Sequence, residues 1–153
     1  MSIVEKAIEV RVPVHVAYNQ WTQFEEFPKF MDGVLEVKQL DEKRLHWRVK
    51  VGGKEKEWDA VITEQVPDMR IAWRETEGAK NSGVVTFHRL SDDMTRIMVQ
   101  MGYDPEGFVE NVGDMLGVMS LRLGKDLARF KEFIEERGEE TGAWRGEIPQ
   151  EKK

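Results

Sequence analysis

The chain has 153 residues, of which 40% are hydrophobic and 34% charged, a composition typical of one globular domain large enough to enclose a pocket. Its net charge of −6 without a basic block argues against a nucleic-acid interface, and the absence of cysteine excludes disulfides and thiolate metal sites. No apolar run is long enough to cross a membrane and no signal-peptide pattern is present, so we expect a cytoplasmic protein without stable membrane insertion.

The first 33 residues predict one strand followed by two short helices. Residues 2–12 alternate between apolar and mainly charged side chains, as a half-buried strand does. Pro13 then opens a helix, because the apolar residues from 14 to 24 recur at helical spacing. Residues 25–30 permit one more short helical turn, which Gly33 ends.

Residues 34–103 change to a period of two and predict an antiparallel meander. Short turn signals separate the strands, and no connection is long enough for a crossover helix. One face of the sheet is strongly apolar, so we expect the long helix that follows to cover it. The predicted strands are 34–40, 44–51, 54–66, 69–76, 82–90 and 94–103.

Residues 105–137 predict one long helix with a continuous apolar stripe, which Gly138 ends. Three glycines and one serine line up beside that stripe. They indicate either close packing of the helix on the sheet or missing side chains that leave a cavity. The remaining residues, 138–153, are polar and glycine-rich, so we interpret them as a loose tail after a single domain of residues 1–137. The small residues are Gly113, Gly117, Ser120 and Gly124.

Two segments near the N-terminus carry a family resemblance: VPVHVAYNQW (12–21) and FEEFPKFM (24–31). With the order of elements, they resemble the START-related helix-grip superfamily and, within it, the polyketide cyclase/dehydrase-like (SRPBCC) family. The resemblance implies an α+β helix-grip fold. In this fold a seven-stranded antiparallel sheet curves around the C-terminal helix, with two short helices between strands one and two and an apolar cavity inside. Family members include lipid carriers, quinone-binding proteins, aromatic-polyketide cyclases and protein-binding proteins, and they share no catalytic motif.

Few polar residues fall at inward-facing positions. Glu75 continues the inward series of Ile71 and Trp73, and Tyr103 ends another such series. If Glu75 faces a cavity, burial would raise its pKa and suit it to proton transfer; alternatively it marks the solvated end of its strand. Tyr103 either orients a polar group of a ligand or caps the core.

Bulky apolar residues at inward positions either form a plain core or line a pocket for a flat, apolar ligand. The three histidines lack the spacing of metal ligands, so no metal or other cofactor is expected. The candidate ligand-binding residues are Trp21, Phe27, Phe30, Trp47, Trp58, Trp73, Phe87, Met101, Tyr103, Phe108, Met115, Gly117, Met119 and Ser120.

The sequence therefore predicts binding of a hydrophobic small molecule, such as a lipid, polyketide or quinone, between the sheet and the C-terminal helix. One alternative is a cyclase or dehydratase that acts on a polyketide or aromatic precursor, for which Glu75 and Tyr103 are the catalytic candidates. A second is a protein-interaction module with a filled core. An oligomer is compatible with the sequence, but no feature of it predicts one.

Overall fold

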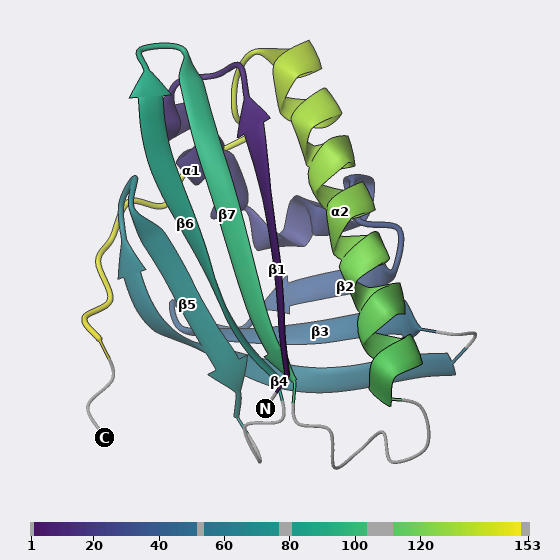
Figure 1. Cartoon of the computed structure of the whole chain (residues 1–153). Helices are drawn as coiled ribbons and strands as arrows, with labels where there is room; N and C mark the ends of the chain where they lie inside the picture. Colours follow the sequence, from purple (N-terminus) through teal and green to yellow (C-terminus); the bar gives the residue numbers. More distant parts are fainter. Residues whose placement is uncertain (1, 52–53, 77–80, 104–111, 151–153) are drawn as a thin grey trace.

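Seven antiparallel strands form one curved sheet in the order β1-β7-β6-β5-β4-β3-β2, and a long helix packs along β1 (Figure 1). The structure, a computed structural model, describes residues 2–51, 54–76, 81–103 and 112–150; the side chains of 2, 51, 54, 81, 103 and 112–119 are outside this description. The strands are β1 (Ser2–Val10), β2 (Val34–Gln39), β3 (Arg44–Val51), β4 (Lys54–Val66), β5 (Arg70–Glu75), β6 (Asn81–Ser91) and β7 (Met94–Tyr103). The helices are α1 (Val14–Trp21), the 3₁₀-helix η1 (Phe24–Lys29) and α2 (Val112–Arg137).

This architecture confirms the predicted helix-grip fold. Strands β2 to β7 pair neighbour to neighbour as a meander, and β1 pairs with the far side of β7. Helix α2 ends as predicted: Gly138 has a φ of +72°, and its amide donates a 2.9 Å hydrogen bond to the Ile134 carbonyl. The predicted start of this helix at Pro105 lies outside the described residues, and its described part begins at Val112.

The sheet bends strongly, so that β2, β3 and β4 run across the direction of β1, β6 and β7 (Figure 1). Register shifts in β2, β4 and β6 mark irregularities of the kind that bend a strand. The shift in β4, between Ile62 and Glu64, also changes which later side chains face inward. Gln65 is consequently buried, and its amide donates a 3.0 Å hydrogen bond to the Tyr18 hydroxyl.

The short helices cover the inner face of the sheet together with α2. We expected the long helix alone to do this, and that expectation is wrong. The Trp21 ring of α1 lies 5.1 Å from the Phe130 ring of α2 and 6.2 Å from the Phe87 ring of β6. Phe27 of η1 lies 5.7 Å from the Trp47 ring of β3. A continuous aromatic cluster therefore joins all three helices to the sheet.

The segment after α2 packs against the body of the protein, so the expectation of a loose tail is wrong for residues 139–150. In Figure 1 it runs from the end of α2 past α1 to the outside of β5. Ile148 is buried and pairs with Gln65 of β4 through backbone hydrogen bonds of 2.8 and 2.9 Å. The Gln20 side chain of α1 accepts a 2.8 Å bond from the Thr141 amide and donates one of 3.1 Å to its hydroxyl.

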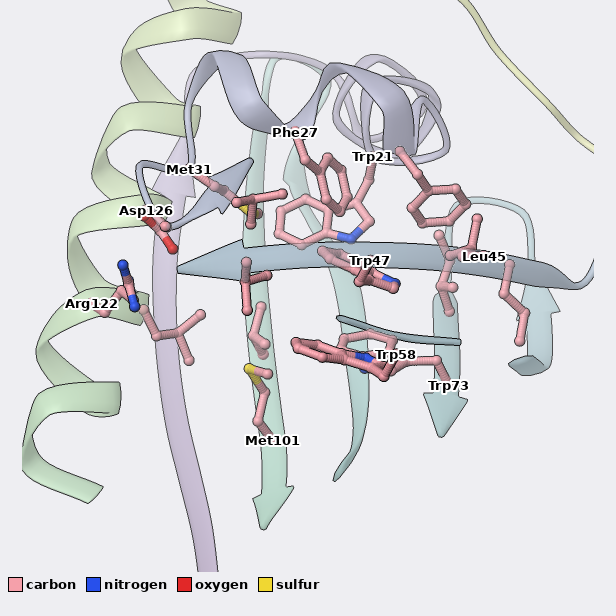
Figure 2. Close-up of a pocket in the computed structure, with 18 residues that line it drawn as sticks. Trp21, Phe27, Met31, Leu45, Trp47, Trp58, Trp73, Met101, Arg122 and Asp126 are labelled. Carbon is pink, nitrogen blue, oxygen red and sulfur yellow. The ribbon is translucent and has the colours of Figure 1, made fainter. Parts of the chain in front are cut away.

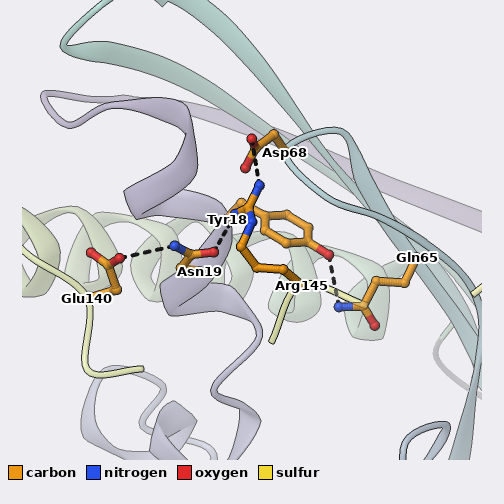
Figure 3. A network of polar contacts seen from close by, with 6 residues as sticks. All are labelled: Tyr18, Asn19, Gln65, Asp68, Glu140 and Arg145. Carbon is orange, nitrogen blue, oxygen red and sulfur yellow. Dashed lines mark hydrogen bonds and ion pairs between the residues drawn. The ribbon is translucent and has the colours of Figure 1, made fainter. Parts of the chain in front are cut away.

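Arg145 is the centre of a polar network that ties this segment to α1 and to the turn after β4 (Figure 3). Its guanidinium donates to Asn19 Oδ1 at 2.6 Å and to Asp68 Oδ2 at 2.8 Å, and it lies 5.5 Å from the centre of the Tyr18 ring. Asn19 in turn donates a 3.0 Å bond to Glu140. The polar side chains of the segment thus satisfy the polar groups that α1 buries.

Candidate functional site

A cavity of about 160 Å³ lies between the curved sheet, the short helices and α2 (Figure 2). Its sheet wall comes from β2, β3, β4, β5 and β7, and its other walls come from α1, η1 with the turn that follows it, and α2. The lining side chains are apolar except for Arg122 and Asp126, both of which belong to α2. The site therefore combines a large apolar surface with one charged pair.

Three half-buried tryptophans on neighbouring strands form one wall of the cavity (Figure 2). Trp47 of β3 is directly opposite Trp58 of β4; their ring centres are 6.4 Å apart and their planes differ by 7°. Trp73 of β5 is opposite Gly83 of β6. A Cβ atom at Gly83 would lie 2.4 Å from the Trp73 indole, so the glycine allows that ring its place. Indole surfaces of this kind bind flat or apolar groups well.

Arg122 is held at the α2 side of the cavity by two neighbours. Its Nη2 donates a 2.8 Å hydrogen bond to the backbone carbonyl of Lys50. The guanidinium also lies against Gly33, where a Cβ atom would come within 2.1 Å of Nη2. A side chain at position 33 would therefore displace the guanidinium from this place.

Asp126 lies one helical turn after Arg122 and is only 8% exposed. Burial raises the pKa of its carboxyl group to about 6, while the positive charges of Arg122 and Arg129 and a hydrogen bond from the Asp32 backbone oppose this rise. Asp32 itself forms an ion pair with Arg129. A carboxyl group with a pKa near 6 changes its protonation state readily near neutral pH, which suits general acid–base chemistry.

Arg122 and Asp126 are not among the predicted site residues, although the sequence carries a signal for Asp126. Asp126 is three residues after Leu123 and four before Phe130, so it belongs to the inward stripe of the helix. A search for apolar residues alone treats such an aspartate as an interruption of the stripe. A search for charged residues at stripe positions would have found it.

Comparison with known proteins assigns this chain to a family. Residues 10–133 match the family described as polyketide cyclase/dehydrase and lipid transport. The chain belongs to this family. It is 56% identical over 149 residues to an uncharacterised 17.2 kDa protein of Streptomyces lincolnensis from the melC2–rnhH intergenic region, covering 97% of this chain and 99% of that protein.

Solved structures share the fold of this family member. A protein from Deinococcus radiodurans is 29% identical, with a TM-score of 0.70, over 90% of this chain and 99% of that one. An aromatase/cyclase, Zhui, from Streptomyces sp. R1128 is 18% identical, with a TM-score of 0.73, over 94% of this chain and 99% of that one. The START superfamily is represented among the similar structures, as the resemblance predicted.

Among the described helices, none is both long and apolar enough to cross a membrane. Within the same described part of the chain, no three His, Cys, Asp or Glu side chains gather as metal ligands.

The structure divides the predicted ligand-binding residues of this family member into two groups. Phe30 and Phe87 pack in the core and do not line the cavity: the Phe30 ring is 5.2 Å from Phe130, and the Phe87 ring is 5.4 Å from Tyr18. The predicted residues that do line the cavity are Trp21, Phe27, Trp47, Trp58, Trp73 and Met101.

The other predicted positions contribute no described contact to the cavity. Glu75 is half-buried opposite Ala60 and does not line the cavity, and Ser120 is half-buried on α2 and does not line it either. Gly124 faces β1, where a Cβ atom would lie 4.0 Å from Lys6 Cε, so at this position the small residue borders the strand. The side chains of Tyr103, Phe108, Met115, Gly117 and Met119 are outside the described residues.

Proposed function

We propose that this protein binds one small, mainly apolar molecule in the cavity between the sheet, η1 and α2. The observation that carries the proposal is the cavity itself: about 160 Å³ of space, walled by three half-buried indoles and other apolar side chains. Open space beside apolar side chains costs stability, because the lining atoms lose contacts that a packed core would provide. Membership of a family that includes lipid transport supports the same function.

The size of the cavity limits the affinity that apolar contact alone provides. A single-ring ligand buries roughly 150 Å² of apolar surface, which at about 25 cal/mol per Å² gives about 4 kcal/mol. That free energy corresponds to a dissociation constant of about 1 mM. Tighter binding therefore requires a polar contact with Arg122 or Asp126, or a ligand that extends beyond this cavity.

A second function, proton transfer to or from the bound molecule, is favoured by Asp126. This carboxyl group lines the cavity, and its pKa of about 6 allows it to accept and release a proton near neutral pH. Cyclases and dehydratases need such a group, and the family includes both. Deuterium exchange next to the carbonyl of a single-ring ketone in D₂O tests this function, since Asp126→Asn should abolish any exchange above the buffer rate.

The alternative of an interaction module with a filled core receives no support from the structure, because the core contains a cavity. Glu75, a catalytic candidate from the sequence, does not line this cavity. We therefore assign the proton-transfer hypothesis to Asp126 and not to Glu75.

Native mass spectrometry and binding of toluene to a cavity-filling variant test the proposed function. Val99 of β7 lines the cavity, so Val99→Phe should fill part of it and weaken toluene binding at least about tenfold. Val84→Phe on β6 is the matched control, because Val84 pairs with Gln100 and lies outside the cavity lining. Absence of a co-purified apolar compound, together with equal toluene binding by both variants and the wild type, would overturn the proposal.

A further inference from the structure

Arg122 and Asp126 add two charged side chains to the otherwise apolar walls of the cavity. Figure 2 shows both side chains on the α2 side, with Trp47, Trp58 and Trp73 across the cavity from them. A ligand ring stacked among the indoles therefore has one edge directed at the charged pair. The pair supplies both kinds of hydrogen-bonding group, since the guanidinium only donates and the ionised carboxylate only accepts.

We propose that the preferred ligand is a single-ring or similarly small apolar molecule with one neutral hydroxyl group, as in a phenol, an enol or an alcohol, and that the hydroxyl lies between Asp126 and Arg122. This inference rests on the proposed binding function and specifies the ligand class of the same cavity. It differs from a preference for large, multi-ring molecules.

The volume supports the limit of one ring. An apolar protein cavity of about 150 Å³ is known to accommodate benzene, and this cavity has about 160 Å³. Most pockets for larger organic ligands enclose roughly 300–1,000 Å³. A molecule with several fused rings would therefore have to leave part of its surface outside the cavity.

The charges support a neutral polar group. Arg122 and Asp126 carry opposite charges, and the neighbouring Asp32–Arg129 ion pair also sums to zero. An anionic ligand would be repelled by the carboxylate of Asp126, and a cationic ligand by the guanidinium of Arg122. A hydroxyl group avoids both repulsions, because it donates its proton to Asp126 and accepts a hydrogen bond from Arg122.

The positions of both groups are constrained before any ligand binds. The bond from Arg122 to the Lys50 carbonyl and the contact with Gly33 hold the guanidinium, and the Asp32 backbone holds the carboxylate. Constrained groups lose little conformational entropy on binding, so their hydrogen bonds contribute more fully to affinity. The pair is thus suited to discriminate between ligands of equal size.

Four single-ring compounds of similar shape test the inference at pH 8: toluene, neutral phenol, anionic benzoate and mainly cationic benzylamine. We expect phenol to bind at least about tenfold more tightly than toluene, as one hydrogen bond to a charged group provides. Benzoate and benzylamine should each bind at least about tenfold more weakly than phenol. Isothermal titration or NMR titration of the wild-type protein measures all four affinities.

Two charge variants sharpen the result. Asp126→Asn leaves Arg122 without its counter-charge, so the affinity for benzoate relative to that for phenol should rise about tenfold. Arg122→Gln should raise the affinity for benzylamine relative to that for phenol by a similar factor. Glu132→Gln is the matched control, because it removes an exposed carboxylate of α2 outside the cavity lining and should leave all ratios unchanged.

The outcomes separate this inference from the function on which it rests. If toluene binds as tightly as phenol, or a charged compound binds most tightly to the wild type, the hydroxyl preference is wrong while apolar binding stands. If none of the four compounds binds, the proposed binding function fails together with the inference.

Discussion

The two ends of the inner face of the sheet are built differently. At one end, Tyr18, Phe130 and Ile134 are fully buried, and α1 and the C-terminal segment close the structure. We call this the filled end. At the other end, which we call the hollow end, Trp47 and Trp58 remain half-buried beside a cavity of about 160 Å³. One sheet and one long helix therefore supply both a packed core and an open site.

The two ends separate the residues that stabilise the fold from those that border the cavity. The buried side-chain amides of Asn19 and Gln20 on α1, at the filled end, have hydrogen-bond partners in the C-terminal segment. At the hollow end, the polar groups of Arg122 and Asp126 border open space. We infer that the filled end provides most of the stability and that the hollow end can bind ligands because it is incompletely packed.

Truncation of two leucines that lie one turn apart on α2 should give the largest difference in stability between the two ends. Leu127 is 1% exposed in the filled core, whereas Leu123 lines the cavity. Leu127→Ala should reduce the free energy of unfolding by about 3–5 kcal/mol, because the truncation leaves a new cavity in packed surroundings. Leu123→Ala should cost at least about 1 kcal/mol less, since open space already borders its side chain. Denaturant unfolding measures both, and equal losses would contradict the division into two ends.

Removal of the C-terminal segment tests what closes the filled end. Truncation after Gly138 should lower the free energy of unfolding by about 2–4 kcal/mol, because the buried side chain of Ile148 and the bonds of Arg145 are lost. The point variant Ile148→Ala should account for a large part of this loss. An unchanged unfolding midpoint after truncation would instead support the expectation of a loose tail.

Asp126→Asn should reveal the cost of a buried charge at the hollow end. The pKa of Asp126 is raised from 3.8 to about 6 in the folded protein, so the native state binds the proton more tightly than the unfolded chain. The stabilisation that comes from this tighter proton binding is fully present below pH 4 and is lost as the pH rises through about 6. The variant should therefore be about as stable as the wild type at pH 4 and about 1–3 kcal/mol more stable at pH 8.

Thermal or denaturant unfolding of both proteins across this pH range measures the difference. Other titrating groups are common to the two proteins and largely cancel in the comparison. A difference in stability that does not vary between pH 4 and pH 8 would show that the folded-state pKa of Asp126 is not raised.

Two valines that face each other on β6 and β7 give the smallest expected contrast. Val85 is opposite Val99, and both are buried, but only Val99 lines the cavity. Val85→Phe should overpack the core and cost about 1–3 kcal/mol. Val99→Phe should cost about 1 kcal/mol less, because part of its ring enters open space. The reverse order of stabilities in urea unfolding would mean that no usable space lies beside Val99.

Much of the fold follows from local sequence patterns. Strands β3, β4 and β7 have the predicted bounds, because alternation and turn residues report directly on a half-buried antiparallel strand. The irregularity in β4 was not predictable in this way. A strict alternation would place Glu64 with Ile62 on the inner face, but the register shift brings Gln65 inward instead.

The candidate site was predicted only in part, for a related physical reason. Indoles such as Trp47 and Trp73 were found because apolar side chains at inward positions have a clear period. Asp126 was missed because its inward position contradicts its polarity, as is common at functional sites. The polar composition after α2 predicts a loose tail, whereas Arg145 and Thr141 pair with buried polar groups of α1.

The most direct test of the hollow end is an NMR titration that observes the indole N–H signals of the five tryptophans. Four of them, Trp21, Trp47, Trp58 and Trp73, line the cavity, whereas Trp144 lies in the C-terminal segment and serves as an internal control. Addition of toluene or phenol should shift the signals of the four cavity tryptophans in a saturable manner and leave that of Trp144 unchanged. Unchanged cavity signals at saturating ligand, or equal shifts of all five, would contradict a ligand site at this end.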